Sequence, residues 1–205
     1  ISSPFKLKIY EGAPFGWITE SNYLMKSDPK DYGVIHDVGA HVYDYMILLL
    51  TAFGIASKDI TTERTLVDYE SLPNNVQSIH KVEGNECDGE IDIKLSRSIL
   101  LMNKLVLTDG NNTIISRPLL DSTILIKIGD KELTIPIPEM SETYKLNNAF
   151  DDMWKHIGST ITSKDNKSII DIESVMSAVK LIDNVILKKE IKSVDNYFKN
   201  FGNEQ

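Results

Sequence analysis

The chain has 205 residues, a length that suits one large domain or two small ones. Hydrophobic residues make up 41% of it and charged residues 25%, as in an ordinary globular protein. The net charge of −8, with Lys and Arg scattered, argues against a surface for nucleic acid or an anionic membrane. The single cysteine, Cys87, allows no intramolecular disulfide, which fits a cytoplasmic protein. We expect neither a membrane span nor a secretory leader.

The first predicted element is a strand followed by a turn. Phe5–Tyr10 alternates apolar and polar residues, which predicts a strand buried on one face. The next stretch, EGAPFGW at Glu11–Trp17, contains two glycines and a proline and predicts a turn that displays Phe15 and Trp17. These aromatics either pin the turn to the core or form a wall that stacks on a substrate, and composition alone favours the core role. Ser21–Tyr32 is polar and loop-like.

The segment Gly33–Leu50 predicts a helix that carries two chemically useful side chains. Asp37 and His41 are four residues apart and would share a face, which Asp44 extends by a turn. The other faces carry Val38, Val42, Tyr45, Met46, Leu48, Leu49 and Leu50. A helix that is apolar nearly all round is buried, and Asp and His are costly there unless they are paired or face a cavity. The helix should end near Phe53-Gly54.

The middle of the chain predicts a run of strands. They are Glu63–Tyr69, Val76–Val82, Glu90–Arg97, Leu101–Thr108, Thr113–Arg117, Thr123–Ile128 and Glu132–Ile137. No helical crossover fits between them, so consecutive strands should pair antiparallel. Arg97 stands out near the end of a strand, and a solvated surface position is its default interpretation.

Two helices are predicted to close the chain, Asn148–Ile161 and Asp171–Lys189. Their apolar stripes are Phe150, Met153, Trp154, Ile157 and Ile161 in the first, and Ile172, Val175, Val179, Ile182 and Ile186 in the second. Each stripe should pack on the sheet, and Lys188 and Lys189 suit the end of the second helix. The predicted fold class is α+β, a single domain over residues 1–205 with a large, open, mostly antiparallel sheet and helices packed on one face.

Asp37 and His41 are the best candidates for chemistry. The sequence has no glycine-rich dinucleotide or phosphate-binding pattern, and its four histidines and lone cysteine have no metal-ligand spacing. A neutral imidazole takes a proton from an alcohol or returns it to a carbonyl, and a carboxylate one turn away orients the ring. The alternative is structural: Asp37 caps the helix and His41 is a core histidine bonded to a carbonyl. The spacing alone favours this structural alternative.

The sequence also resembles a known family. G-V-I-H-D-V-G-A-H-V-Y-D at Gly33–Asp44 resembles the D-x-G-x-H-x-x-D helix motif in the C-terminal domain of the glucose–fructose oxidoreductase/inositol dehydrogenase (Gfo/Idh/MocA) family. EGAPFGW resembles a strand and loop found upstream in some members. S-R-S-I-L-L-M-N at Ser96–Asn103, followed by L-V-L-T-D-G-N-N-T-I, is similar to strands that run through a Ser-Arg…Asn pattern into a hairpin. The two closing helices also match in order.

The resemblance implies a Rossmann domain that binds NAD or NADP, followed by this α+β domain with the substrate pocket and commonly an oligomer interface. Members oxidise or reduce hydroxyl or keto groups of sugars, nucleotide sugars or polyols. Carried onto this chain, His41 would be the acid/base, and Asp37 would bind substrate and tune His41. The resemblance thus reverses the preference that spacing alone gave for this pair.

This chain departs from the family in two ways. Only Gly33 stands where the family has a run of glycines, and the Rossmann domain with its catalytic lysine is missing. We therefore expect a fragment of a longer protein, inactive alone, with no cofactor-binding or metal-binding residues of its own. The expected partners are a sugar-type substrate, on which Trp17 and Phe15 could stack, and further copies through the sheet. The alternative is a non-catalytic oligomerisation or sugar-binding scaffold.

Overall fold

The three-dimensional structure is a computed structural model of the chain. It describes residues 3–14, 33–68, 75–84, 87–101, 103–110, 112–116, 123–136 and 172–192, together with helical residues at 151, 154–155, 157–159 and 162. No helix among these residues is both long enough and apolar enough to cross a membrane.

The described residues form strands and helices close to the predicted ones. The strands are β1 (Phe5–Gly12), β2 (Ile60–Asp68), β3 (Asn75–Glu83), β4 (Asp88–Ser96), β5 (Lys104–Asp109), β6 (Asn112–Ser116), β7 (Thr123–Ile128), β8 (Lys131–Pro136) and β9 (Lys189–Lys192). The helices are a π-helical turn (Ile35–Gly39), α1 (Ala40–Ala52), a 3-10 turn (Ser57–Asp59) and α3 (Ile172–Leu187). The predicted α+β fold class is confirmed.

The strands form one nine-stranded sheet in the order β8-β7-β6-β5-β1-β4-β3-β2-β9. Six of the eight neighbouring pairs are antiparallel, and the two parallel pairs are β1 with β4 and β2 with β9. The prediction that all consecutive strands pair was wrong at β4 and β5, because β1 lies between them. The first strand of the chain therefore occupies the middle of the sheet.

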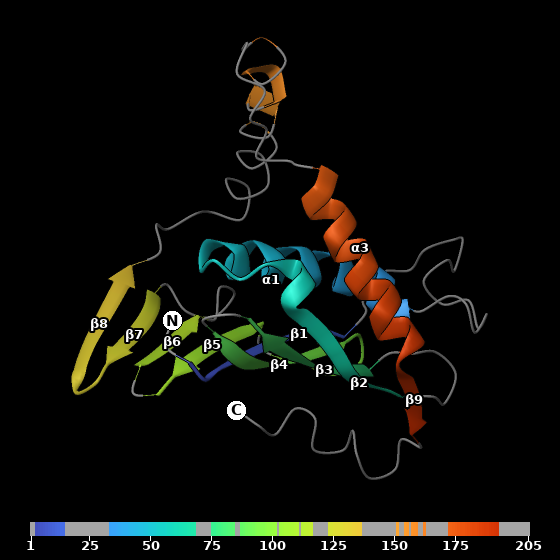
Figure 1. Ribbon diagram of the computed structural model, residues 1–205, viewed down its shortest axis with the longest axis horizontal. Helices are drawn as coiled ribbons and strands as arrows, with labels where there is room; N and C mark the ends of the chain where they lie inside the picture. Colours follow the sequence, from blue (N-terminus) through green and yellow to red (C-terminus); the bar gives the residue numbers. More distant parts are fainter. Residues whose placement is uncertain are drawn as a thin grey trace.

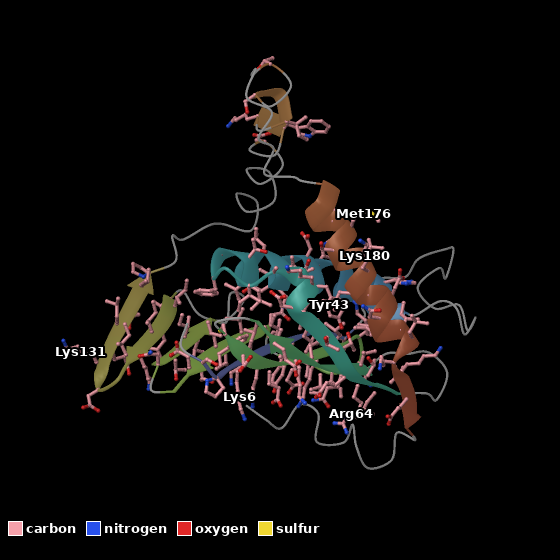
Figure 2. All side chains as sticks on the ribbon, in the orientation of Figure 1. Lys6, Tyr43, Arg64, Lys131, Met176 and Lys180 are labelled. Atoms are coloured by element: carbon pink, nitrogen blue, oxygen red, sulfur yellow. The ribbon has the colours of Figure 1, made fainter. Side chains whose placement is uncertain are left out.

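The two described long helices cover the same face of the sheet (Figure 1). The side of α1 that faces the strands carries Val42, Tyr43, Met46, Ile47 and Leu50, all buried. They pack on inward-facing strand residues such as Leu7, Ile91 and Ile93, which are fully buried in the same core. Figure 2 shows Tyr43 between α1 and the sheet, whereas Lys6 and Arg64 lie on the opposite face.

A chain of buried polar side chains crosses the interface between α1 and the sheet. The Tyr43 hydroxyl and the Ser78 hydroxyl are 2.7 Å apart, and His80 Nε2 lies 2.9 Å from the same Ser78 oxygen. His80 Nδ1 lies 3.1 Å from Thr62 Oγ1, and the His80 ring packs edge-on against the Tyr43 ring. These bonds satisfy polar groups that would otherwise be costly to bury, and they fix the position of α1 on the sheet.

Several details of the helix predictions were wrong. The helix Gly33–Leu50 is not buried all round, because Tyr45 is 44% exposed and Leu48 is 60% exposed. In α3 the buried side is Ala178, Leu181, Ile182 and Val185, so Val175 and Val179 of the predicted stripe are exposed. α3 also ends at Leu187, and Lys189 begins β9 instead of closing the helix. Described residues between 151 and 162 are helical, but Trp154 is 64% exposed, against the prediction of a buried stripe.

Candidate active site

The apolar faces of two central strands each end in a charged residue. In β1, Phe5, Leu7 and Ile9 point into the core, and the alternation places Glu11 next on that face. In β4, the buried Ile91, Ile93 and Leu95 lead in the same way to Arg97, one residue beyond the strand. The parallel register pairs Glu11 with Leu95. Glu11 and Arg97 therefore lie close together on the face that the helices cover.

The helical side of the site begins with a π-helical turn. Gly33 has φ +40°, a conformation that L side chains rarely adopt, and the turn Ile35–Gly39 follows it. Gly39 lies directly on β4, since a Cβ there would be 3.2 Å from Leu95 Cδ1. A π-helical turn contains more residues than an α-helical one, and Asp37 lies within it, ahead of α1, which begins at Ala40. Such turns are frequent at functional sites.

Asp37, in the π-helical turn, is bound by Arg97. Arg97 Nε donates to Asp37 Oδ2 at 2.7 Å, and Arg97 Nη2 donates to the same oxygen. The two side chains are 26% and 30% exposed, so the ion pair is largely shielded from water. The alternative role of Asp37 as a helix cap is not observed, because Gly39 precedes α1 and no side chain caps it. The default interpretation of Arg97 as a solvated surface residue was also wrong.

His41 lies on the exposed side of the first turn of α1. The alternative that it is a buried core histidine is therefore excluded. His41 is an electrostatic neighbour of Glu11, which also has Arg97 and Asp37 around it. Burial raises the pKa of Glu11 and Asp37 raises it too, whereas His41 and Arg97 lower it.

Tyr45, one turn beyond His41 on α1, completes the group. Burial raises the pKa of Tyr45, and the charge of Glu11 raises it further. We call these residues the acid–base cluster: Glu11 of β1, Asp37 of the π-helical turn, His41 and Tyr45 of α1, and Arg97, which directly follows β4. The cluster combines two carboxyl groups, an imidazole, a phenol and a guanidinium, which is a set suited to moving protons and binding hydroxyl groups.

The connection between β4 and β5 is hydrogen-bonded to the end of β1. Ala13 N donates to Ser96 O at 3.2 Å, and Leu101 N donates to Gly12 O at 3.0 Å. Gly12 N donates to Asn103 Oδ1 at 3.3 Å. A Cβ on Gly12 would lie 2.8 Å from the Ile99 carbonyl oxygen, so only glycine fits. The start of the EGAPFGW stretch and the Ser-Arg…Asn stretch are therefore joined by hydrogen bonds.

Two predicted substrate-binding residues, Phe15 and Trp17, lie outside the described residues. Asp44 of the predicted stripe is exposed on α1.

A cavity of about 210 Å³ lies between Phe53 and strands β5 to β7, and a second cavity lies near Phe5 and Glu90. Neither cavity is lined by a residue of the acid–base cluster. Among the described residues, no three metal-ligating side chains gather at one point.

Sequence reasoning missed Glu11 and Tyr45 and did not assign a role to Arg97. A signal was present: Glu11 and Arg97 each continue the apolar side of an alternating strand. A charged residue in such a position needs a partner, and two of them on separate strands indicate a shared site. The missing information was that β1 and β4 are neighbours, which no local pattern specifies.

No protein-family model matches the sequence, and neither does any curated protein sequence. Solved structures do resemble the chain. One is KijD10, a 3-ketoreductase from Actinomadura kijaniata in complex with NADP and TDP-benzene, with a TM-score of 0.65 and 10% identity over 92% of this chain and 55% of that one. The chain shares its fold with this oxidoreductase.

Two further structures give the same result. An NAD binding oxidoreductase from Klebsiella pneumoniae has a TM-score of 0.62 and 10% identity over 90% of this chain and 55% of that chain. An oxidoreductase from Sinorhizobium meliloti has a TM-score of 0.57 and 11% identity over 89% of this chain and 53% of that one. The chain spans a little over half the length of the solved structures it matches.

Proposed function

We propose that this chain is the C-terminal, substrate-binding domain of an NAD(P)-dependent oxidoreductase of the Gfo/Idh/MocA type, acting on a hydroxyl or keto group of a sugar, nucleotide sugar or polyol. One observation carries the proposal: an exposed histidine, His41, and an Asp37–Arg97 ion pair both act electrostatically on one partly buried carboxyl group, that of Glu11. The motif that holds Asp37 and His41 is the one that resembles the family, and the fold is shared with NAD(P)-binding oxidoreductases.

In this proposal His41 is the acid/base. Its imidazole takes the proton of the substrate hydroxyl during oxidation and returns it during reduction. Asp37 Oδ2 receives both bonds from Arg97, which leaves Oδ1 to accept a hydrogen bond from a second substrate hydroxyl. Arg97 holds the Asp37 carboxylate in place, so that the hydroxyl next to the reacting one is held in a fixed position.

The described residues do not fit a nicotinamide dinucleotide. The sequence has no G-x-G-x-x-G turn, and neither of the two described parallel strand pairs is followed by a helix with a glycine-rich start. The dinucleotide of this proposal, NAD or NADP, is therefore held by residues other than those described. The role of this domain is to bind the substrate, orient it and move the proton.

The test uses the whole protein that contains this chain. Nicotinamide absorbance is recorded against a panel of sugars, nucleotide sugars and polyols for the wild type and for His41→Ala, with His36→Ala as the matched control from the preceding turn. We expect His41→Ala to lower turnover by roughly a hundredfold or more with cofactor binding intact. If turnover in His41→Ala is the same as in the wild type, the acid/base role of His41 is contradicted.

The second candidate function is an assembly or sugar-binding scaffold without redox chemistry. The observation that favours assembly is a group of exposed apolar side chains on the β7–β8 hairpin at the edge of the sheet, Ile128, Leu133 and Ile135. Analytical ultracentrifugation of the whole protein, with Leu133→Lys as the variant, tests this surface. An oligomer that dissociates in the variant, combined with no turnover on any substrate, would favour the scaffold over the enzyme.

A further inference from the structure

We propose that Tyr43 is a positioning residue for His41: its buried hydrogen bond to Ser78 of β3 holds the first turn of α1 in one place on the sheet and thereby sets where the His41 imidazole stands. The inference rests on the proposed function and adds a residue and its role to it. It starts from the contact between the hydroxyls of Tyr43 and Ser78, whose oxygens are 2.7 Å apart.

The segment that carries His41 is tied to the sheet on both sides of this residue. Four residues before it, Asp37 of the π-helical turn accepts two hydrogen bonds from Arg97. Two residues after it, Tyr43 is bonded to Ser78 of β3. Among the described residues, no side chain caps the π-helical turn or α1, so contacts with the sheet take the place of a cap in holding the start of the helix.

His41 and Tyr43 point in nearly opposite directions from α1. Residues two apart on an α-helix are rotated by about 200° from each other. His41 is accordingly exposed, whereas Tyr43 is fully buried between α1 and the sheet (Figure 2). Tyr43 therefore acts on the imidazole through the helical backbone that the two residues share, which makes it a positioning residue.

The partner of Tyr43 on the sheet is itself held in place. The Ser78 oxygen lies 2.9 Å from His80 Nε2, and His80 Nδ1 lies 3.1 Å from Thr62 Oγ1 of β2. The His80 ring also packs edge-on against the Tyr43 ring, with the ring centroids 5.8 Å apart. The Ser78 hydroxyl is therefore a fixed point, and the contact reaches from α1 across β3 to β2.

A hydrogen bond restrains α1 more closely than apolar packing does. Val42, Met46 and Ile47 also pack in the core, but apolar contacts have no preferred direction and allow small sliding movements. A bond between oxygens 2.7 Å apart restrains both a distance and an angle. Burial raises the pKa of Tyr43, so the phenol keeps its proton in the neutral pH range and the bond persists there.

The position of the imidazole matters because proton transfer requires a close approach. A general base works within hydrogen-bond distance of the proton that it takes. A misplacement of about 1 Å can lower a rate by about a hundredfold. Loss of the Tyr43 hydroxyl should therefore lower kcat more than it raises KM.

The first test compares two buried tyrosines in the whole protein. Tyr43→Phe removes the hydroxyl bonded to Ser78. Tyr10→Phe, the matched control, removes a buried hydroxyl that donates to Asp92 Oδ2 at 3.0 Å on the other face of the sheet. We expect both variants to lower the midpoint of urea denaturation, but only Tyr43→Phe to lower kcat, by roughly tenfold or more with KM little changed. If kcat falls equally in both variants, or in neither, the positioning role is overturned.

Ser78 provides a second arm of the same test. Ser78→Ala removes the other hydroxyl of the bond and should reproduce the loss of kcat. The double variant Tyr43→Phe/Ser78→Ala should lose no more activity than the worse of its single variants, because both changes break one bond. Losses of kcat that multiply in the double variant would mean that the two residues act separately.

The second test measures the first turn of α1 without using turnover. Hydrogen exchange of the backbone amides, followed by mass spectrometry, reports how readily this turn opens. We expect Tyr43→Phe to speed exchange across residues 37–43 by roughly tenfold, and Tyr10→Phe to leave it at the wild-type rate. Exchange in this segment that is the same in both variants overturns the proposal.

The two proposals fail in different ways. If the whole protein has no turnover but exchange across residues 37–43 still responds to Tyr43→Phe alone, the proposed function is wrong, and Tyr43 still positions the turn that carries His41. If turnover depends on His41 while Tyr43→Phe and Tyr10→Phe give the same kcat and the same exchange, Tyr43 is not a positioning residue and the proposed function stands.

Discussion

The buried histidine His80 predicts how the stability of this protein depends on pH. His80 is fully buried between Thr62 and Ser78, and burial lowers its pKa from 6.5 to about 3. In the unfolded chain the same imidazole takes a proton near pH 6.5, whereas in the folded protein it stays neutral. The stability that the neutral ring provides is therefore fully present above pH 6.5 and is lost as the pH falls from 6.5 toward 3.

The size of this loss of stability follows from the shift in the pKa of His80. Each pH unit below 6.5 costs about 1.4 kcal/mol until the folded state also binds the proton. Between pH 7 and pH 5 we therefore expect His80 to reduce the free energy of unfolding by about 2 kcal/mol. This figure changes little if the folded pKa is one unit higher, because pH 5 still lies above it.

Urea denaturation at pH 5, 6 and 7 measures the effect. Carboxyl groups also respond to acid, so the quantity to compare is the difference in unfolding free energy between the wild type and His80→Gln at each pH. This difference should fall by about 2 kcal/mol from pH 7 to pH 5, and the substitution of an exposed histidine, His36→Gln, is the matched control. A difference that is constant across the three pH values would refute the assignment of His80 as a neutral buried imidazole.

Two further substitutions test the geometry of the site. Gly12→Ala should destabilise the protein by about 1–3 kcal/mol, measured by urea denaturation, because the new methyl group meets the Ile99 carbonyl oxygen at 2.8 Å. Arg97→Ala should cost about 1–3 kcal/mol by the same assay, because it leaves the Asp37 carboxylate shielded from water without a cation. The double variant Asp37→Asn/Arg97→Ala should cost clearly less than the sum of its single changes.

Controls for these two predictions lie in the same chain. Gly158→Ala is the match for Gly12→Ala, because nothing lies within 4 Å of the position of its new Cβ and its stability should not fall. An equal loss in both glycine variants would mean that the close contact at Gly12 is not the cause. For the ion pair, effects of Asp37→Asn and Arg97→Ala that add within about 0.3 kcal/mol would argue against a direct interaction.

Much of the fold could be predicted from local patterns. Strands β1 to β8 and the helix containing Asp37 and His41 were located to within a few residues, because alternation and helical periodicity record which side chains face a core. The end of α1 at Phe53-Gly54 followed from the same logic, and Gly54 has φ +80° there. β9 was missed because Lys189–Lys192 is short and pairs with a distant strand, β2.

The sequence by itself determined which residue types stand at the candidate site, including the Asp37–His41 spacing and the motif that resembles an oxidoreductase family. It did not determine which of them meet. Only the tertiary structure placed β1 beside β4, which brought Glu11 and Arg97 together under the helix and assigned Asp37 to Arg97. The physical reason is that strand order and charge pairing depend on contacts between distant segments, whereas periodicity reports only whether a side chain faces the core.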